Sequence, residues 1–407
     1  MDPVHEQYET YPYPARDPAD EAARLIEGSP SALREIDHFI FGGARDWSKP
    51  FRALVAGGGT GDGLIQLAQK LKDAGCPADI TYVDMSSASR RIAEARAAAR
   101  GLTIKFDTAD LIEAAPRLAV EGGAFDYIDC CGVLHHLPDP QAGFAALSGA
   151  LAPDGGMGVM VYAPYGRTGV YALQDAFGAL LANDPPTDKV ALARQALATL
   201  PPTNWFNRNE FLSDHEAGDA GLYDLLLHAR DRPFDIAALD GALAAAGLGM
   251  VSVLEPIRYD PGQYLPDAPA FAQRVAALTP IARMALAERL AGNIRLHVVY
   301  AAKAGRAGKA MARMTPDARP RLAGLSARAL SQEIAKKGRL RVSFAGFRHQ
   351  ISMPKAAAPL IARLDGRPLG VIAREAGMDW LVFAQTFGPV WRGLTSANLL
   401  HCSQGLK

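Results

Sequence analysis

The chain has 407 residues, of which 49% are hydrophobic, so it is long enough to bury a large core and to form two or three domains. Its four cysteines are too few and too irregularly spaced for a disulfide framework or a zinc knuckle. No apolar run is long enough to span a membrane, and no signal peptide is visible before the first predicted strand, so we expect a cytoplasmic protein with reduced thiols.

The formal net charge of +0 hides an uneven distribution. Residues 306–407 contain 17 lysines and arginines and five acids, a charge of +12, which leaves −12 for the rest of the chain. We expect this basic tail to pack on its own acidic body or on a second subunit, as in a homodimer. An acidic partner or nucleic acid is the alternative.

Residues 1–50 form a leader that contains a Tyr-Pro-Tyr-Pro stretch, followed by short predicted helices at 18–27 and 30–41. Strands and helices then alternate, which predicts an α/β fold with a doubly wound, Rossmann-like, seven-stranded sheet over residues 51–303. The predicted strands are 51–56, 79–83, 103–106, 125–130, 157–163, 249–254 and 295–301. The predicted helices are 62–74, 86–100, 140–151 and 235–246. Helical insertions at 164–232 and 256–290 interrupt the alternation.

Residues 304–322 are rich in Gly, Ala, Arg and Pro and are predicted to be a linker. The part at 323–407 has a different pattern: a hairpin at 339–344 and 349–353, helices at 355–364, 369–376 and 379–394, and a strand at 397–401. A helix, a tight turn, a second helix and a short strand resemble a winged-helix domain.

A glycine cluster follows the first strand, and an acid, Asp84, ends the second. This order favours an adenosine-bearing cofactor at the carboxyl ends of the strands. The spacing excludes the dinucleotide fingerprint G-x-G-x-x-G, because Asp62, Leu64 and Gln66 stand where the third glycine would be in the three possible frames. No Gly-Lys-Ser/Thr of a Walker A loop is present.

The G-x-G-x-G run, Asp84 and the segment Gly-Val-Leu-His-His-Leu-Pro-Asp-Pro at 132–140 resemble class I S-adenosylmethionine-dependent methyltransferases. The resemblance implies that Asp84 accepts hydrogen bonds from the ribose, with a helix N-cap as its alternative role. It places Asp110 near the adenine, with Asp107 as the rival. The cofactor-binding residues that it implies are Tyr11, Tyr13, Gly57, Gly58, Gly59, Gly61, Asp62, Asp84, Met85, Asp110, Leu111, Cys131 and Gly132.

One position departs from this family. The acid that usually ends the first strand, two residues before the first glycine, is Val55 here. An acid near the ammonium group of the cofactor is therefore missing or comes from elsewhere, and Asp62 and Asp129 are the two substitutes that we consider.

The acceptor side of the site is harder to predict. His135 is the candidate base if its ring faces the methyl group, although His135 and His136 both suit a packing role. Tyr165 and Arg167 follow the fifth strand and would line the acceptor pocket, where Arg167 would clamp an anion or only bridge a loop. Tyr11 and Tyr13 would form a lid over the cofactor, or would simply pack on the core.

These patterns predict methyl transfer from S-adenosylmethionine to a small molecule or a protein side chain by in-line displacement. The methyl group is already activated in this cofactor, so the reaction requires neither a metal ion nor a covalent nucleophile. The alternative hypothesis is a cofactor sensor or nucleic-acid-binding regulator that uses the basic C-terminal part.

Overall fold

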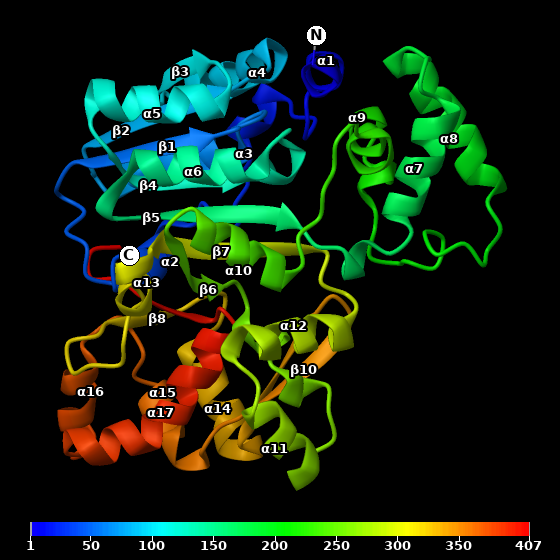
Figure 1. Ribbon diagram of the computed structural model, residues 1–407. Helices are drawn as coiled ribbons and strands as arrows, with labels where there is room; N and C mark the ends of the chain where they lie inside the picture. The colour runs from blue at the N-terminus through cyan, green and yellow to red at the C-terminus, as the bar shows by residue number, and fades with distance from the viewer. Residues whose placement is uncertain (1, 407) are drawn as a thin grey trace.

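The computed structural model describes residues 2–406 and shows an α/β protein built on a seven-stranded sheet (Figure 1). The strand order is β3-β2-β1-β4-β5-β7-β6, and only β7 runs antiparallel to its neighbours. The strands are β1 Phe51–Ala56, β2 Ala78–Asp84, β3 Lys105–Thr108, β4 Phe125–Cys131, β5 Leu151–Tyr162, β6 Leu248–Val253 and β7 Leu296–Lys303. The predicted doubly wound, Rossmann-like sheet is confirmed.

Both faces of the sheet are buried, as expected for parallel strands with helices on each side. Alternate residues of β1 enter opposite cores: Leu54 and Ala56 belong to one apolar cluster, Ala53 and Val55 to another. The helices of the first cluster are α5 Leu111–Gly122, α6 Pro140–Ala150 and α10 Ile236–Ala245. Those of the second are α2 Leu33–Ile40, α3 Asp62–Asp73 and α4 Ser87–Ala99.

Several elements differ from the prediction. The leader begins with an unpredicted helix, α1 Pro3–Thr10, in which Asp2 accepts the Val4 N–H as N-cap. Helix α5 was also not predicted; its interior holds Pro116, which removes one helical hydrogen bond. Strand β5 begins six residues earlier than expected, and its pairing with β4 is irregular between Leu151 and Gly156.

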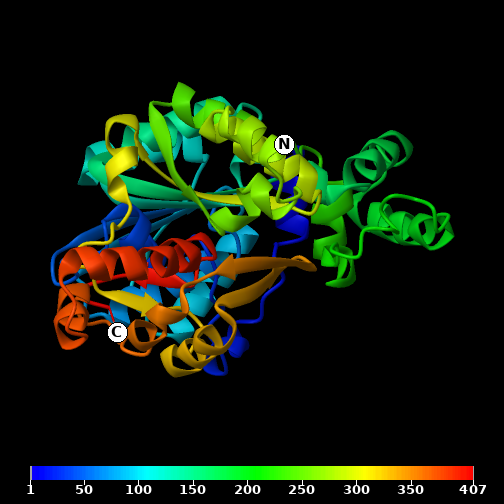
Figure 2. The same cartoon turned by 90° about the horizontal axis from the view of Figure 1, so that it is seen from below.

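The first insertion contains α7 Val170–Leu180, α8 Pro186–Thr199, α9 Asp219–Leu222 and a π-helical turn, Tyr223–Leu227. It has an apolar cluster of its own and projects from the body beyond the carboxyl end of β5 (Figure 2). The second insertion contains α11 Pro269–Ala276 and α12 Pro280–Ala291. No helix within residues 2–406 combines the length and the apolar character that crossing a bilayer requires.

The predicted linker is packed rather than extended. It contains α13 Ala304–Ala310, whose Arg306 donates hydrogen bonds to the carbonyls of Gly155 and Ile40. The C-terminal part contains α14 Ala327–Lys337, the hairpin β9 Arg339–Phe344 and β10 Phe347–Ser352, and the helices α15 Ala358–Ile361, α16 Leu369–Glu375 and α17 Trp380–Ser396. Its likeness to a winged helix stays a prediction.

The C-terminal part docks on α2 of its own chain. A two-stranded sheet of β8 Pro320–Leu322 and β11 Leu400–Cys402 brings the chain end to this helix. The Ser403 hydroxyl donates to Asp37 at 2.5 Å, and the Cys402 N–H donates to His38 Nδ1 at 3.0 Å. The donors in these contacts are uncharged. The contacts therefore do not depend on attraction between the basic C-terminal part and the acidic remainder of the chain.

Candidate functional site

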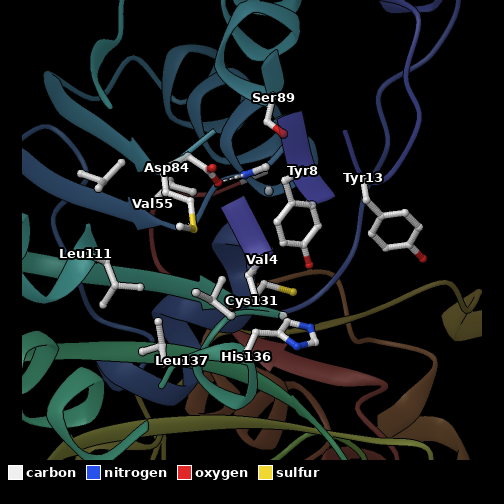
Figure 3. Close-up of a pocket in the computed structure, with 18 of the residues that line it drawn as sticks. Val4, Tyr8, Tyr13, Val55, Asp84, Ser89, Leu111, Cys131, His136 and Leu137 are labelled. Carbon is white, nitrogen blue, oxygen red and sulfur yellow. Dashed lines mark hydrogen bonds between the residues drawn. The ribbon is translucent and has the colours of Figure 1, made fainter. Parts of the chain in front are cut away.

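A cavity of about 400 Å³ lies at the carboxyl ends of β1, β2, β3 and β4 (Figure 3). Its floor is the glycine loop and the ends of these strands, which is where open α/β sheets bind their ligands. Residues of the N-terminal segment, among them Tyr8 and Tyr13, line it from the other side. The inserted π-helical turn adds Asp224.

The glycine loop lines the cavity through Gly57, Gly58 and Gly59. A Cβ atom on Gly57 would clash with Val133, and one on Gly58 would clash with Tyr82. These two positions therefore require glycine, and they keep the backbone open to a ligand. Gly61 has a different place.

Gly61, at φ 101°, precedes α3 and does not line the cavity. Its Cβ position faces Ala93 of α4, so this glycine permits close packing of the two helices. The cofactor contact expected of Gly61 stays a prediction that its position does not support.

Asp84 ends β2 and faces the cavity. One carboxylate oxygen accepts the Gly59 N–H and the other accepts the Ser86 N–H, both at 2.8 Å. Burial raises the pKa of Asp84. The N-cap of α4 is Ser86, so Asp84 does not have the alternative capping role, and each oxygen keeps a lone pair for a ribose hydroxyl. Met85 lines the cavity beside it.

Asp110 and Leu111 line the cavity after β3, at the start of α5. Asp110 is the N-cap of this helix and accepts the Ile112 N–H at 2.7 Å. Its rival, Asp107, forms an ion pair with Arg117 and does not line the cavity. The structure thus favours the register that places Asp110 at the adenine end.

The two possible substitutes for an acid at Val55 have different partners. Asp62 lines the cavity but forms ion pairs with Arg16 at 2.6 Å and Arg96 at 2.7 Å. Asp129 stands on β4 directly opposite Val55 in the sheet register. It is 1% exposed, lines the cavity, and accepts a hydrogen bond from the Ser31 hydroxyl at 2.5 Å.

Burial raises the pKa of Asp129 to about 6, against the opposing effect of the Ser31 hydrogen bond. A buried carboxylate with one neutral partner has unused acceptor capacity. Cys131 and Gly132 follow it at the end of β4, and both line the cavity as expected.

The far end of the cavity is built around the buried carboxylate of Asp224. The Tyr8 hydroxyl donates to one of its oxygens at 3.1 Å and the Tyr162 hydroxyl donates to the other at 3.0 Å. Burial raises the pKa of Asp224, while nearby His136 and the two hydrogen bonds act to lower it. Sequence reasoning missed this carboxylate.

Two histidines lie beside Asp224, and of these His136 lines the cavity while His228 does not. The rings of His136 and His228 are stacked, with centroids 3.7 Å apart and planes 15° from parallel. His136 Nδ1 is 2.7 Å from the Arg230 carbonyl, while the Arg230 N–H donates to His228 Nδ1 at 3.0 Å. Figure 3 shows Tyr8 pointing toward His136 at this end and Asp84 at the other end of the cavity.

The three residues predicted for catalysis, His135, Tyr165 and Arg167, do not line the cavity. His135 is fully buried, packs on Tyr162 with centroids 4.3 Å apart, and does not line the cavity. Burial lowers its pKa well below the usual value. Among residues 2–406, neither ring nitrogen of His135 has a hydrogen-bond partner.

Arg167 and Tyr165 do not line the cavity either. Arg167 forms a buried ion pair with Asp231 at 3.1 Å, and its guanidinium lies 3.7 Å from the Tyr162 ring centre. Arg167 thus bridges the inserted segment, which was its alternative role, and Tyr165 is half-buried near Arg289. The catalytic roles predicted for these three residues are not supported by their positions.

The two tyrosines predicted to form a lid, Tyr11 and Tyr13, have different positions in the structure. Tyr13 lines the cavity, with its hydroxyl 3.5 Å from Asp214. Tyr11 does not line it; its ring packs on Tyr223 with centroids 5.4 Å apart. The leader residue that bonds Asp224 is Tyr8, which sequence reasoning did not single out.

Within residues 2–406, two groups of side chains have the composition of a metal site: His136, Asp224 and His228, and His135, His136 and Asp231. In the first, the imidazole planes are nearly parallel and stacked, so their in-plane lone pairs do not meet at one point. In the second, Asp231 is already paired with Arg167. Neither arrangement fits an ion without rearrangement.

Comparison with known proteins agrees with this geometry. Residues 54–157 match the family model of a methyltransferase domain. An uncharacterized protein of Synechococcus sp. is 29% identical over 297 residues, covering 70% of this chain and 67% of that protein. The ubiquinone biosynthesis O-methyltransferase of Thiobacillus denitrificans is 28% identical over 144 residues, covering 34% of this chain and 53% of that enzyme.

Among solved structures, PKMT2 from Rickettsia typhi in complex with AdoHcy aligns over 92% of this chain and 75% of its own, with a TM-score of 0.61 and 14% identity. This likeness concerns the fold. Together with the strand order and the matched domain, it identifies the chain as an enzyme of the class I methyltransferase fold. The chain thus contains a methyltransferase domain, and S-adenosylmethionine is its cofactor.

Proposed function

We propose that this enzyme transfers the methyl group of S-adenosylmethionine to an amine nitrogen, carried by a small molecule or by a protein side chain. The single observation that supports this acceptor is the buried carboxylate of Asp224 at the end of the cavity opposite Asp84. The rest of the proposal follows from its surroundings.

The surroundings of Asp224 suit a cationic or hydrogen-bond-donating group. The oxygens of Asp224 are bonded by tyrosine hydroxyls rather than by guanidinium or ammonium groups. An amine N–H or an ammonium ion would add a charge-assisted hydrogen bond to this carboxylate. The rings of Tyr8, Tyr13 and Tyr162 border the same space and offer π-faces to a positive charge. A carboxylate or phosphate acceptor would be repelled there.

The residues present also fit the cofactor. Gly57, Gly58 and Gly59 leave open backbone where any side chain would clash with the loop's neighbours or fill the cavity, and Asp84 offers two acceptors to a ribose. When bound, S-adenosylmethionine supplies an activated methyl group on a sulfonium. We propose that Asp129 holds the ammonium group of its methionine part in place of the acid missing at Val55.

A direct test is transfer of labelled methyl groups to matched acceptors. The holoenzyme is offered compounds and peptides that differ only in carrying an amine or a hydroxyl group, and product formation is followed by mass spectrometry. We expect methylation of the amine series, and a fall of at least ~10-fold for Asp224→Asn because the charge-assisted bond is lost. Asp219→Asn, which removes an exposed ion pair with Arg194, is the matched control. Exclusive labelling of hydroxyl groups would contradict the proposal.

The second hypothesis, a regulator that binds nucleic acid through the basic tail, stays a prediction. Electrophoretic mobility shifts measured over a range of salt concentrations would test it. Binding driven by phosphate contacts must weaken steeply as salt rises.

A further inference from the structure

We infer that His136 is the general base of the reaction, acting through Nε2, and that Asp224 stabilises the imidazolium that forms. The inference rests on the proposed amine acceptor, because an ammonium group must lose a proton before its nitrogen becomes a nucleophile. It is based on the hydrogen bonds that determine which ring nitrogen of His136 lacks a proton.

The backbone of Arg230 sets the two stacked imidazoles in opposite tautomers. Its carbonyl only accepts, so His136 Nδ1, 2.7 Å away, must carry the proton, and Nε2 of the neutral ring holds a lone pair. Its N–H only donates, so His228 Nδ1, at 3.0 Å, must be bare. In its neutral form His228 therefore carries its proton on Nε2.

The proton on His228 Nε2 is donated to the Tyr8 oxygen. This Nε2 lies 3.2 Å from the Tyr8 oxygen, and the Tyr8 hydroxyl donates onward to Asp224 at 3.1 Å. Burial, followed by the charges of His136, Arg230 and Arg167, lowers the pKa of His228 well below its usual value. His228 therefore stays neutral and serves as a donor that orients Tyr8.

The unprotonated Nε2 of His136 is open to the cavity. His136 lines the cavity, and among residues 2–406 its Nε2 has no hydrogen bond, yet it is not among the buried atoms that lack a partner. A ligand atom of His136, an oxygen of Asp224 and a nitrogen of His228 all lie within 4.8 Å of one another. An imidazolium formed at His136 would thus lie beside a buried carboxylate, which stabilises it.

The environment of Asp224 contains charges from several elements. Burial raises the pKa of Asp224. His136, the Tyr162 hydroxyl of β5, Arg167 of the inserted segment and the Tyr8 hydroxyl of α1 act against this effect. The oxygens of Asp224 already accept two hydrogen bonds. Asp224 therefore serves as the counter-charge to the imidazolium and not as the base. His136 is the group with a free lone pair.

In the proposed step the acceptor nitrogen loses one proton and gains one methyl group. One N–H bond of the acceptor ammonium breaks, the proton moves to His136 Nε2, and the electron pair remains on nitrogen. That pair forms the bond to the methyl carbon while the carbon–sulfur bond breaks and its electrons stay on sulfur. The imidazolium then returns its proton to solvent, so no further reactant is needed.

The test combines a kinetic and a spectroscopic measurement. His136→Asn keeps an amide donor for the Arg230 carbonyl but removes the base. We expect kcat to fall by ~10²- to 10⁴-fold near neutral pH and to recover as the acceptor deprotonates at high pH, with affinity for S-adenosylhomocysteine unchanged. His215→Asn, which alters a ring packed on Phe206 away from the cavity, is the control. A variant with the parental kcat and pH profile would overturn the inference while leaving the amine acceptor intact.

Nitrogen-15 NMR of the full chain supplies a readout without turnover. His136 should show the Nδ1–H tautomer and His228 the Nε2–H tautomer. An Nε2–H signal from His136 would overturn the inference even if amines are methylated. If amines are not methylated by the parent enzyme, the proposed function fails, and the base role in amine methylation fails with it.

Discussion

Replacing Asp129 by Asn should stabilise the free protein and weaken cofactor binding, two effects of opposite sign. Burial raises the pKa of this carboxyl from 3.8 to about 6. A shift of roughly 2 units at about 1.36 kcal/mol per unit means that the ionised carboxylate costs the folded state about 3 kcal/mol near neutral pH. The folded protein holds this proton more tightly than the unfolded chain does. The contribution of Asp129 to the free energy of unfolding therefore falls as pH rises from about 4 to about 6. It is constant above that range.

The asparagine side chain has nearly the same shape and carries no charge to bury. The variant should therefore unfold at a higher temperature than the parent near pH 8, and this advantage should shrink near pH 5, where the parental carboxyl is mostly protonated. Thermal unfolding of both proteins side by side measures the difference. Ser31→Ala removes the single hydrogen bond and keeps the charge, so it is a control that should not gain stability.

The cofactor half of the prediction uses two ligands. S-adenosylhomocysteine has an ammonium group and 5′-methylthioadenosine has none. Losing one charge-assisted hydrogen bond costs about 1.5–3 kcal/mol, so calorimetry should show ~10- to 150-fold weaker binding of the first ligand and little change for the second. An equal loss for both ligands, or none for either, would refute the assignment of Asp129.

Two further predictions concern the cofactor's ribose and the leader. Asp84→Asn should weaken S-adenosylhomocysteine binding by ~10- to 150-fold in calorimetry, because the ribose loses a charged acceptor, while Asp107→Asn should have no effect; equal affinities would exclude the ribose contact. Arg96 is 1% exposed and pairs with Glu21 at 2.6 Å, so Arg96→Met should lower stability by about 3–5 kcal/mol in urea unfolding. Exposed Arg91→Met on the same helix is its control, and similar midpoints for the two variants would argue against a stabilising network.

The cofactor end of the site was predictable because its signals are local in sequence. Glycines directly after a buried strand, and an acid at the end of the next strand, must meet at one edge of a parallel sheet. The positions of Gly57 and Asp84 follow from this rule, whereas Asp110 was implied by the family resemblance. The departure at Val55 was also visible, but which acid compensates depends on the strand register that places Asp129 opposite it.

The acceptor end was not predictable for a physical reason. Tyr8 and Asp224 are 216 residues apart and meet only through tertiary packing. The choice between His135 and His136 depends on how a short 3₁₀ turn, Leu134–His136, orients two adjacent rings. Asp224 and His228 have helical i, i+4 spacing, which was the one available signal that they share a face. The π-helical turn that carries Asp224 is a feature that sequence patterns do not indicate.

The division between these two ends has a consequence for specificity. The matched methyltransferase domain, residues 54–157, contains the glycine loop, Asp84, Asp110 and Asp129, which line the cavity and which we propose hold the cofactor. The acceptor end combines His136 of that domain with Tyr8 of the leader and Asp224 of the insertion. Changes in the leader or the insertion can therefore alter the acceptor without disturbing cofactor binding. Exchange of these two segments between relatives should change the acceptor preference and leave the affinity for S-adenosylhomocysteine unchanged.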